Sequence, residues 1–413
     1  MRQSRVVGMI SVFVMALMGS QTAAFAEKNE PLHIIVSLKD QHLRVYQGTQ
    51  EIAQSNISSG KRGNETPTGI FSVLQKNRHH RSNIYSNAPM PFMQRLTWSG
   101  IALHASNNVP DHPASHGCVR LPHEFARELF RMKTRGAHVI IEENAVTPQL
   151  ISHDKLFQPK VTWKQNSEYD PWVNAHIEKS NTGFITAKSQ EPVRVHITRR
   201  THKEDLFEVQ RLLNKLGFDA GTVDGYMGPV TWNAITEFQK AQGNKPNGKI
   251  DGQLLKSLYK KANEEKPANG RLLVRQGQLP IYEAQVTITN PELPLGSHLV
   301  SATGFDKSNQ KTDWLHVSLE DRVHRRINLQ KALEIEQTTS RRSVSEALDR
   351  VTMSAKVKSQ VSRLLTSGSS ITISDNGLSI ETGAKATDFI VLTKPEHTTK
   401  FAEQVDPSST ISN

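Results

Sequence analysis

The stretch Ser115-His116-Gly117-Cys118-Val119-Arg120 contains the only cysteine of the 413-residue chain. A single cysteine rules out a disulfide within the chain and any metal centre built from several cysteines. The residue is either an inert buried thiol or a nucleophile, and a thiol becomes nucleophilic when its surroundings favour the thiolate. The residues around Cys118 therefore decide between these two interpretations.

Three neighbouring features favour a reactive thiol. His116 lies two residues before Cys118, and His104 lies upstream at the end of a predicted strand. A helix predicted to begin near Pro122 would direct the positive end of its dipole toward the thiol. Gly117 lets a substrate approach the backbone closely, and its N–H and that of Cys118 could hold an oxyanion. Together these features predict a Cys–His acyl-transfer site in which either histidine could be the base.

A zinc site is the competing interpretation of the same residues. His104, His112, His116 and Cys118 could in principle bind zinc, as the ligands of a metalloamidase do. The loop contains two prolines and lacks the helical H-E-x-x-H arrangement. We therefore expect no metal and no other cofactor.

The sequence on either side of the cysteine predicts a mostly β domain over residues 31–143. Apolar residues alternate with polar ones or form short apolar runs, as strands do. Residues 76–97 have little pattern and are expected to form a loop. The expected elements are strands at 31–38, 43–45, 70–74, 101–104 and 137–141, with one helix after Pro122.

The rest of the chain divides into four segments. Residues 144–200 are polar without sustained periodicity, which predicts a linker or lid. Over residues 203–261 apolar residues recur at helical spacing, and Asp251 fits an N-cap. Residues 268–395 mix strand-like and helical runs, which predicts an α+β region of unknown role. Residues 396–413 are expected to form a polar tail.

Residues 1–26 are typical of a cleaved secretory signal peptide. Arg2 and Arg5 precede an apolar run from Val6 to Met18, and Ala24-Phe25-Ala26 fits a cleavage site. The apolar run is shorter than the roughly 20 residues that a membrane-spanning helix needs. We therefore expect export to the periplasm without a transmembrane anchor.

The charge distribution favours a polyanionic partner. The formal net charge is +11, and the excess of Lys and Arg lies before residue 263, because residues 263–413 carry equal numbers of acidic and basic residues. A basic surface attracts polyanions. An exported protein rarely meets nucleic acid, so we expect an anionic cell-wall polymer and no nucleic acid.

The stretch around Cys118 resembles the active-site signature of the YkuD-type L,D-transpeptidases. That signature has a histidine at a strand end, followed by Ser-His-Gly-Cys-x-Arg. The resemblance covers residues 31–143 and includes Ser59-Gly60-Lys61 and Thr66-Pro67-Thr68-Gly69-Ile70-Phe71, which look like the family's S-x-G-K and T-P-x-G-x-F segments. It implies a β-sandwich-like domain that needs no cofactor.

The resemblance also implies roles for the matching residues. Cys118 would be the nucleophile, and His104 would be the proton donor and acceptor. His116 would shape the site, and the backbone of His116, Gly117 and Cys118 would hold the oxyanion. The family commonly has Gly or Ser after the base histidine. Here that residue is Ala105, so any contact at this position must use its backbone carbonyl.

Two further residues of the signature are candidate substrate contacts. Arg120 would bind a carboxylate of the peptidoglycan stem peptide or brace the loop. Ser115 would lie beside it in the substrate-binding part of the site.

Residues 203–261 resemble the peptidoglycan-binding domain 1 family, a small module of three helices. The matching residues include Val209-Gln210, Leu216-Gly217-Phe218 and the loop Asp224-Gly225-x-x-Gly228-x-x-Thr231. The resemblance implies contact with peptidoglycan glycan or peptide. The candidate contacts are Asp224, Tyr226 and Trp232.

These observations predict a multidomain, exported cysteine L,D-transpeptidase that acts on the tetrapeptide stems of peptidoglycan. The acyl acceptor would be a diaminopimelate amine, giving a 3–3 cross-link, or an amine of an outer-membrane or wall-anchored protein. The alternatives are an L,D-carboxypeptidase or hydrolase of the same fold, and a non-catalytic peptidoglycan-binding protein.

Overall fold

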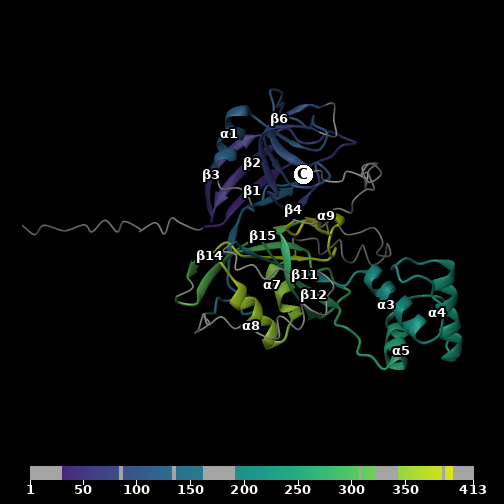
Figure 1. The fold of residues 1–413 in the computed structure, drawn as a ribbon. Coiled ribbons are helices and arrows are strands. Elements are labelled where there is room, and N and C mark those ends of the chain that lie inside the picture. Colours follow the sequence, from purple (N-terminus) through teal and green to yellow (C-terminus); the bar gives the residue numbers. More distant parts are fainter. Residues whose placement is uncertain are drawn as a thin grey trace, which may run out of the picture.

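The computed structural model describes residues 30–82, 87–132, 136–160, 191–306, 308–320, 343–383 and 387–393. The predicted signal peptide and polar tail lie outside these residues, as does most of the predicted linker. Figure 1 shows a β-rich N-terminal domain above a C-terminal region of strands and helices, with a separate helical region to one side. Within the described ranges no helix combines the length and hydrophobicity needed to cross a membrane.

The described residues of the N-terminal domain form two sheets and one helix. Its elements are β1 (Leu32–Ser37), β2 (His42–Gln47), β3 (Gln50–Asn56), β4 (Gly69–Ser72), β5 (Gln75–Arg81), β6 (Pro89–Arg95), β7 (Ala102–Ala105), β8 (Val119–Leu121), α1 (His123–Arg131) and β9 (His138–Glu142), joined by β18 (Val391–Leu392) from the far end of the chain. One sheet has the order β18-β4-β9-β1-β2-β3 and the other β5-β6-β7-β8.

Both sheets and α1 share one buried apolar cluster. Ile34 of β1, Phe71 of β4, Leu103 of β7, Val119 of β8 and Leu129 of α1 all belong to it. The apolar positions of the predicted strands therefore face this core, and the prediction of a β-rich domain is confirmed.

The prediction of a loop at residues 76–97 is wrong. These residues form most of an antiparallel hairpin of β5 and β6. Most β5 side chains are exposed, so the strand lacks the apolar alternation that marks a half-buried strand. Lys76 Nζ of β5 donates to the carbonyl oxygens of Phe130 and Met132 beside the end of α1, at 2.6 and 2.9 Å. Backbone pairing and this contact hold β5 in place.

The helical region consists of α3 (His202–Lys215), α4 (Pro229–Ala241) and α5 (Gly252–Ala262). Leu213, Ile235 and Leu258, one from each helix, are fully buried in their common core. Asp251 accepts hydrogen bonds from the first turn of α5 at 2.9 and 3.0 Å, as the sequence predicts for an N-cap. The prediction of a helical region is therefore confirmed.

The C-terminal region is built on a sheet of eight strands with the order β10-β15-β14-β17-β11-β12-β13-β16. Its elements are β10 (Gln149–Ile151), β11 (Val193–Arg199), β12 (Gly270–Gln276), β13 (Leu279–Ile288), β14 (Ser297–Asp306), β15 (Lys311–Leu319), α7 (Val344–Asp349), β16 (Val351–Thr352), α8 (Ala355–Leu364), β17 (Ser370–Ser374) and α9 (Ile380–Gly383). Residues of α7 and α8 share the apolar core of this sheet.

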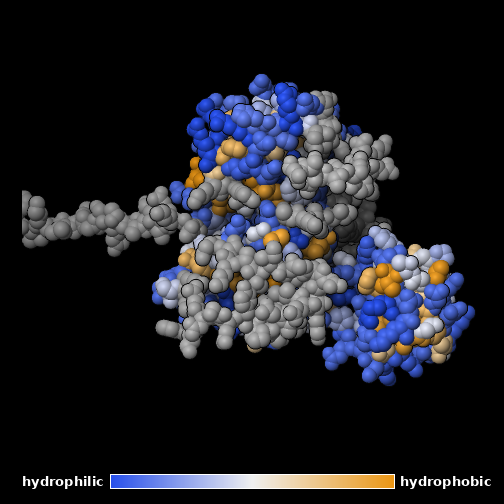
Figure 2. All heavy atoms as spheres, viewed as in Figure 1, coloured by the Kyte–Doolittle hydropathy of each residue, from blue (hydrophilic) through white to orange (hydrophobic). Residues whose placement is uncertain are grey.

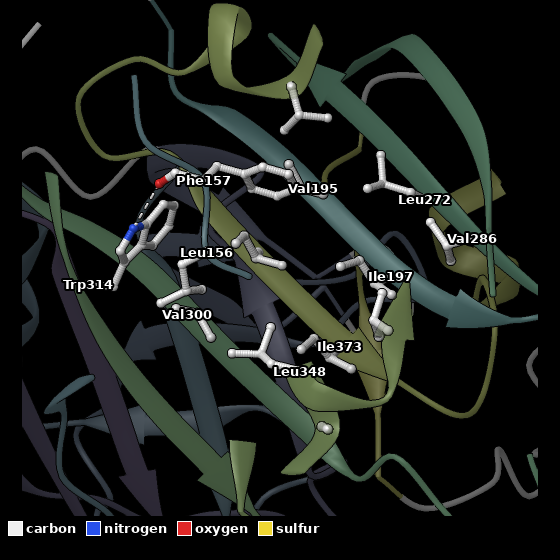
Figure 3. Packing of buried hydrophobic residues seen from close by; sticks show 14 of the residues in the cluster. Leu156, Phe157, Val195, Ile197, Leu272, Val286, Val300, Trp314, Leu348 and Ile373 are labelled. Carbon is white, nitrogen blue, oxygen red and sulfur yellow. Dashed lines mark hydrogen bonds between the residues drawn. The ribbon is translucent and has the colours of Figure 1, made fainter. Parts of the chain in front are cut away.

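Figure 3 shows this core from close by, with Phe157 and Trp314 at one end of it. The Trp314 indole N–H donates to the Phe157 carbonyl at 3.1 Å. Leu156 and Phe157 come from the segment after the N-terminal domain, so they anchor that segment to the C-terminal region.

Two strands of the C-terminal sheet come from the segment expected to be a linker. β11 pairs with β12 and β17, and β10 pairs with β15. Val193, Val195 and Ile197 do alternate in β11, but the intervening Arg194 and His196 are also buried. A strand that is buried on both faces does not show the alternation of apolar and polar residues that marks a half-buried strand. Because β11 also contains buried polar residues, its sequence has the polar character expected of a linker.

The N-terminal domain and the C-terminal region share a buried interface. β18 pairs with β4 and extends the N-terminal sheet. A second apolar cluster joins Ile35, Ile70 and Ile140 of that sheet to Leu299 and Val317 of the other. The α+β region of unknown role is therefore packed against the N-terminal domain.

Candidate active site

Cys118 lies immediately before β8, beside β7. The two strands are parallel, with Leu103 opposite Val119 and His104 opposite Arg120. Leu103 and Val119 face the core. Because side chains alternate along a strand, His104, Cys118 and Arg120 lie on the opposite face. This register brings three predicted site residues together.

The Cys118 thiol is largely enclosed. It packs against Met90, Met93 and Ala102. Its Sγ donates to the Gly100 carbonyl at 3.3 Å. Burial raises the pKa of the thiol, while the Ala102 backbone and the positive charges of Arg95 and Arg120 oppose that increase. The free site thus holds a protonated thiol beside groups that can stabilise a thiolate.

His104 is buried and neutral. Its Nδ1 lies 2.8 Å from the Ala105 carbonyl oxygen. Since a carbonyl only accepts, Nδ1 carries the proton and Nε2 keeps its lone pair. Burial lowers the pKa of His104 to about 4, with smaller contributions from Arg120 and His80. The predicted use of the Ala105 carbonyl is confirmed. The pKa directions of the two groups favour a neutral thiol and a neutral imidazole in the free site over a thiolate and an imidazolium.

The loop from Ser115 to Cys118 is held by its own hydrogen bonds. Ser115 Oγ donates to the Cys118 carbonyl at 2.5 Å and accepts from the Gly117 N–H at 3.2 Å. Thr66 Oγ1 donates to the Gly117 carbonyl at 2.8 Å. Gly117 has φ +108°, and a Cβ there would lie 2.9 Å from Ile101 Cδ1, so only glycine fits.

This loop corrects two expectations. Gly117 N–H is already donated to Ser115, so it is not a free oxyanion donor, and the backbone N–H groups of His116 and Cys118 remain the candidate donors. Ser115 is 2% exposed, and it fixes the loop from within instead of facing a substrate. The sequence could not distinguish a serine that contacts substrate from one that closes a turn.

The remaining histidines do not join the thiol in a metal site. His116 and His112 are exposed, whereas His104 is buried with Nδ1 on a carbonyl. Among the residues that the structure describes, the group with metal-ligand spacing is His153, Asp154 and Asp349 in the C-terminal region. The zinc interpretation of the Cys118 loop is therefore not supported by the geometry.

The helix expected to begin near Pro122 is α1, which begins at His123, after the whole of β8. The field of a helix end falls off within about one turn. The contribution of this helix to the thiol therefore stays a prediction, whereas the positive charges of Arg95 and Arg120 act on the thiol.

Arg120 is the cation best placed to meet a substrate. Its backbone forms a bridge with Ser58. In the described part of the chain its guanidinium makes no hydrogen bond or ion pair, although its charge reaches both His104 and Cys118. Arg95 is a second cation at the thiol, which the sequence reasoning missed because its strand was expected to be a loop.

In the helical region, Asp224 orders its own loop. Its Oδ1 accepts from Tyr226 N at 2.8 Å and from Gln210 Nε2 at 3.1 Å, and these contacts lower its pKa. Tyr226 is 64% exposed and Trp232 48% exposed. Figure 2 shows apolar side chains among hydrophilic ones on the visible face of this region. The two aromatic residues therefore remain candidate contacts, whereas Asp224 is structural.

Two family models match the chain. Residues 31–141 match the L,D-transpeptidase catalytic domain (YkuD), and residues 202–258 match a putative peptidoglycan binding domain. No curated protein matches. The chain therefore contains the two domains that the sequence resembles.

Solved L,D-transpeptidases resemble part of this chain. One from Mycobacterium smegmatis is 20% identical, with a TM-score of 0.26, and the match covers 27% of this chain and 59% of that one. One from Stackebrandtia nassauensis is 26% identical, with a TM-score of 0.26 and coverage of 30% and 62%. The C442S mutant from Enterococcus faecium is 25% identical, with a TM-score of 0.25 and coverage of 28% and 50%. The match thus spans between half and 62% of these chains.

Proposed function

We propose that this chain is a cysteine L,D-transpeptidase of peptidoglycan in which Cys118 is the nucleophile and His104 the base. One observation carries the proposal: the Cys118 thiol, a neutral His104 with Nε2 unprotonated, and an Arg120 guanidinium lie on one face of neighbouring strands. A nucleophile, a base and an anion-binding cation are the parts that acyl transfer between peptides requires.

The first half-reaction forms a thioester. His104 Nε2 takes the thiol proton, and the sulfur attacks the carbonyl carbon of the third stem residue. The Cys118 N–H stabilises the resulting oxyanion. The tetrahedral intermediate collapses, its C–N bond breaks, and terminal D-alanine leaves with the proton from His104. Arg120 binds a stem carboxylate, which orients the scissile bond.

The second half-reaction releases the enzyme. An acceptor amine attacks the thioester carbonyl and gives its proton to His104, and the thiolate leaves and is then reprotonated. A diaminopimelate amine gives a 3–3 cross-link, and an amine of an outer-membrane or wall-anchored protein attaches that protein to the wall. Neither half-reaction calls for a metal or organic cofactor.

The helical region would keep the enzyme on its polymeric substrate. The family match of residues 202–258 supports this role. Exposed Tyr226 and Trp232 offer flat apolar surfaces of the kind that stack on sugar rings. The sequence of residues 1–26 supports export, and we place the enzyme in the periplasm.

Product analysis tests the proposal. The mature protein and its Cys118→Ala variant are incubated with purified disaccharide-tetrapeptide, and the products are weighed by mass spectrometry. A cross-linked dimer that has lost one D-alanine, formed by the parent alone, supports transpeptidation. Tripeptide alone would instead establish an L,D-carboxypeptidase. A donor unchanged by the parent, with no adduct on the protein, would favour a non-catalytic binding protein.

A further inference from the structure

The described end of the C-terminal region reaches into the catalytic domain at the turn next to the thiol. Glu381 of α9 accepts two backbone hydrogen bonds there, Oε2 from Trp98 N at 2.8 Å and Oε1 from Ser99 N at 2.9 Å. A carboxylate that accepts two N–H groups fixes both the position and the orientation of a peptide segment. This contact joins residues that are more than 280 positions apart in the sequence.

The turn that Glu381 holds connects β6 to β7. Thr97 closes it from within, because Thr97 Oγ1 accepts from Ile101 N at 3.0 Å and the Thr97 carbonyl accepts from Gly100 N at 3.3 Å. The carbonyl of Gly100, three residues after Thr97 in the same turn, accepts a hydrogen bond from the Cys118 thiol. The position of this acceptor therefore depends on the turn, and the orientation of the sulfur depends on the acceptor.

Glu381 is itself fixed from both sides. Arg275 of the C-terminal sheet is 9% exposed and donates to the Thr382 carbonyl at 2.8 Å. Immediately after β18, Thr393 N donates to the Thr68 carbonyl at 3.1 Å in the catalytic domain. The backbone next to Glu381 is thus held by a buried arginine, and the chain beyond it is held at the edge of the catalytic domain, which distinguishes Glu381 from a surface charge that meets the turn by chance.

The charge of Glu381 also acts near the site. Arg95 lies 5.7 Å from the Trp98 ring, and its positive charge interacts with both Glu381 and Cys118. Glu381 therefore lies where it can fix the turn and balance the cation beside the thiol.

We propose that Glu381 is a positioning residue for the Cys118 thiol, so that the C-terminal region completes the active site of the catalytic domain. The effect of Glu381 on turnover rests on the proposed function, whereas its effect on the position of the thiol does not. Loss of Glu381 would loosen the turn and weaken the hydrogen bond that the protonated thiol donates to Gly100. An acceptor for the neutral form raises a pKa, so its loss lowers the thiol pKa. A less oriented sulfur would also attack the substrate more slowly.

Alkylation with iodoacetamide tests the positioning without any assumption about the substrate. Cys118 is the only cysteine, so incorporation of the reagent into the full-length protein reports this thiol alone. Rates are measured from pH 5 to 10 for the parent, Glu381→Ala, Glu381→Gln and the control Glu346→Ala. Glu346 is an exposed residue of α7. Turnover of disaccharide-tetrapeptide and the melting temperature are measured on the same samples.

We expect the midpoint of alkylation to fall by about half a pH unit or more in Glu381→Ala, with turnover reduced at least about tenfold. Glu381→Gln keeps one acceptor oxygen and should show a smaller change of both quantities, and Glu346→Ala should match the parent. This opposite movement, a more reactive thiol with slower turnover, is a change that simple unfolding does not produce.

Two results would overturn the positioning role. One is an alkylation profile and turnover of Glu381→Ala that match the parent. The other is a fall of both rates in proportion to a lowered melting temperature. If the alkylation profile shifts as expected but the parent does not turn over the tetrapeptide, the positioning role stands and the proposed function fails.

Discussion

Replacement of Arg194 by leucine should destabilise the packing of the catalytic domain against the C-terminal region. Arg194 is 6% exposed and lies between the two. Its guanidinium donates to His138 Nε2 at 2.9 Å and to the Gly136 carbonyl at 2.5 Å on the catalytic side. On the C-terminal side it donates to Ser370 Oγ at 3.1 Å and lies 3.5 Å from Asp388 Oδ2.

The expected cost follows from the partner left behind. Asp388 is 5% exposed, so Arg194→Leu leaves a buried carboxylate without its ion-pair partner. Removal of one member of a buried pair costs about 3–5 kcal/mol. Removal of both charges, in Arg194→Leu with Asp388→Leu, avoids the unpaired charge and should recover a large part of that loss.

Urea unfolding followed by tryptophan fluorescence measures both effects, because Trp314 is buried in the C-terminal core. We expect the single variant to unfold at a lower urea concentration and the double variant at an intermediate one. A single variant destabilised by less than about 1 kcal/mol would refute the reasoning, since that cost is typical of a surface pair. The reasoning would also be refuted if the double variant lost as much free energy of unfolding as its two single substitutions lose together.

Four further predictions concern the sheet edge, pH and substrate contact. Gly69→Ala should lower the melting temperature by several degrees, because Gly69 has φ +155° and a Cβ there would lie 2.0 Å from the Val391 carbonyl oxygen; an unchanged calorimetric melting curve would contradict this. Burial lowers the pKa of His298 to about 4 from 6.5, so the unfolded state binds more protons between these values. Stability should therefore be complete above about pH 6.5 and decline toward pH 4, and a urea midpoint that is flat over this range would contradict it. With a pKa of about 4, His104 should keep its base form down to about that pH, so the acid limb of kcat/KM should lie near 4, and a limb near 6.5 would point to another base. Trp232→Ala should reduce retention on purified sacculi at least about fivefold with no change in melting temperature, and full retention would remove Trp232 from the binding surface.

The sequence predicted the elements whose apolar residues follow a simple period or form a short run. The helices of the middle region were found from apolar residues at helical spacing, because one face of each is buried. β1 and β9 were found as short apolar stretches, because both faces of each strand are buried. β5 was missed because most of its side chains are exposed, and β11 because its charged Arg194 is buried at an interface. Pairing of β18 with β4 joins segments more than 300 residues apart, and no local pattern carries that information.

The candidate site was predicted in composition and corrected in detail. Cys118, His104 and Arg120 share one face because of the β7–β8 register, so the structure brings together three residues that the resemblance named. The role of Ser115 changed because a serine close to a nucleophile can equally bond the backbone of its own loop. Glu381 had no signal in the sequence, since its partners are backbone N–H groups that any residue could supply.

The intact mass of the protein, quenched shortly after it is mixed with disaccharide-tetrapeptide, tests the central claim most directly. The proposal predicts a transient adduct equal to the donor minus alanine, located on the peptide that contains Cys118, and its absence from Cys118→Ala. Two results together would contradict the assignment of Cys118 as the nucleophile. The parent would form product without any adduct, and Cys118→Ala would remain active under the same conditions.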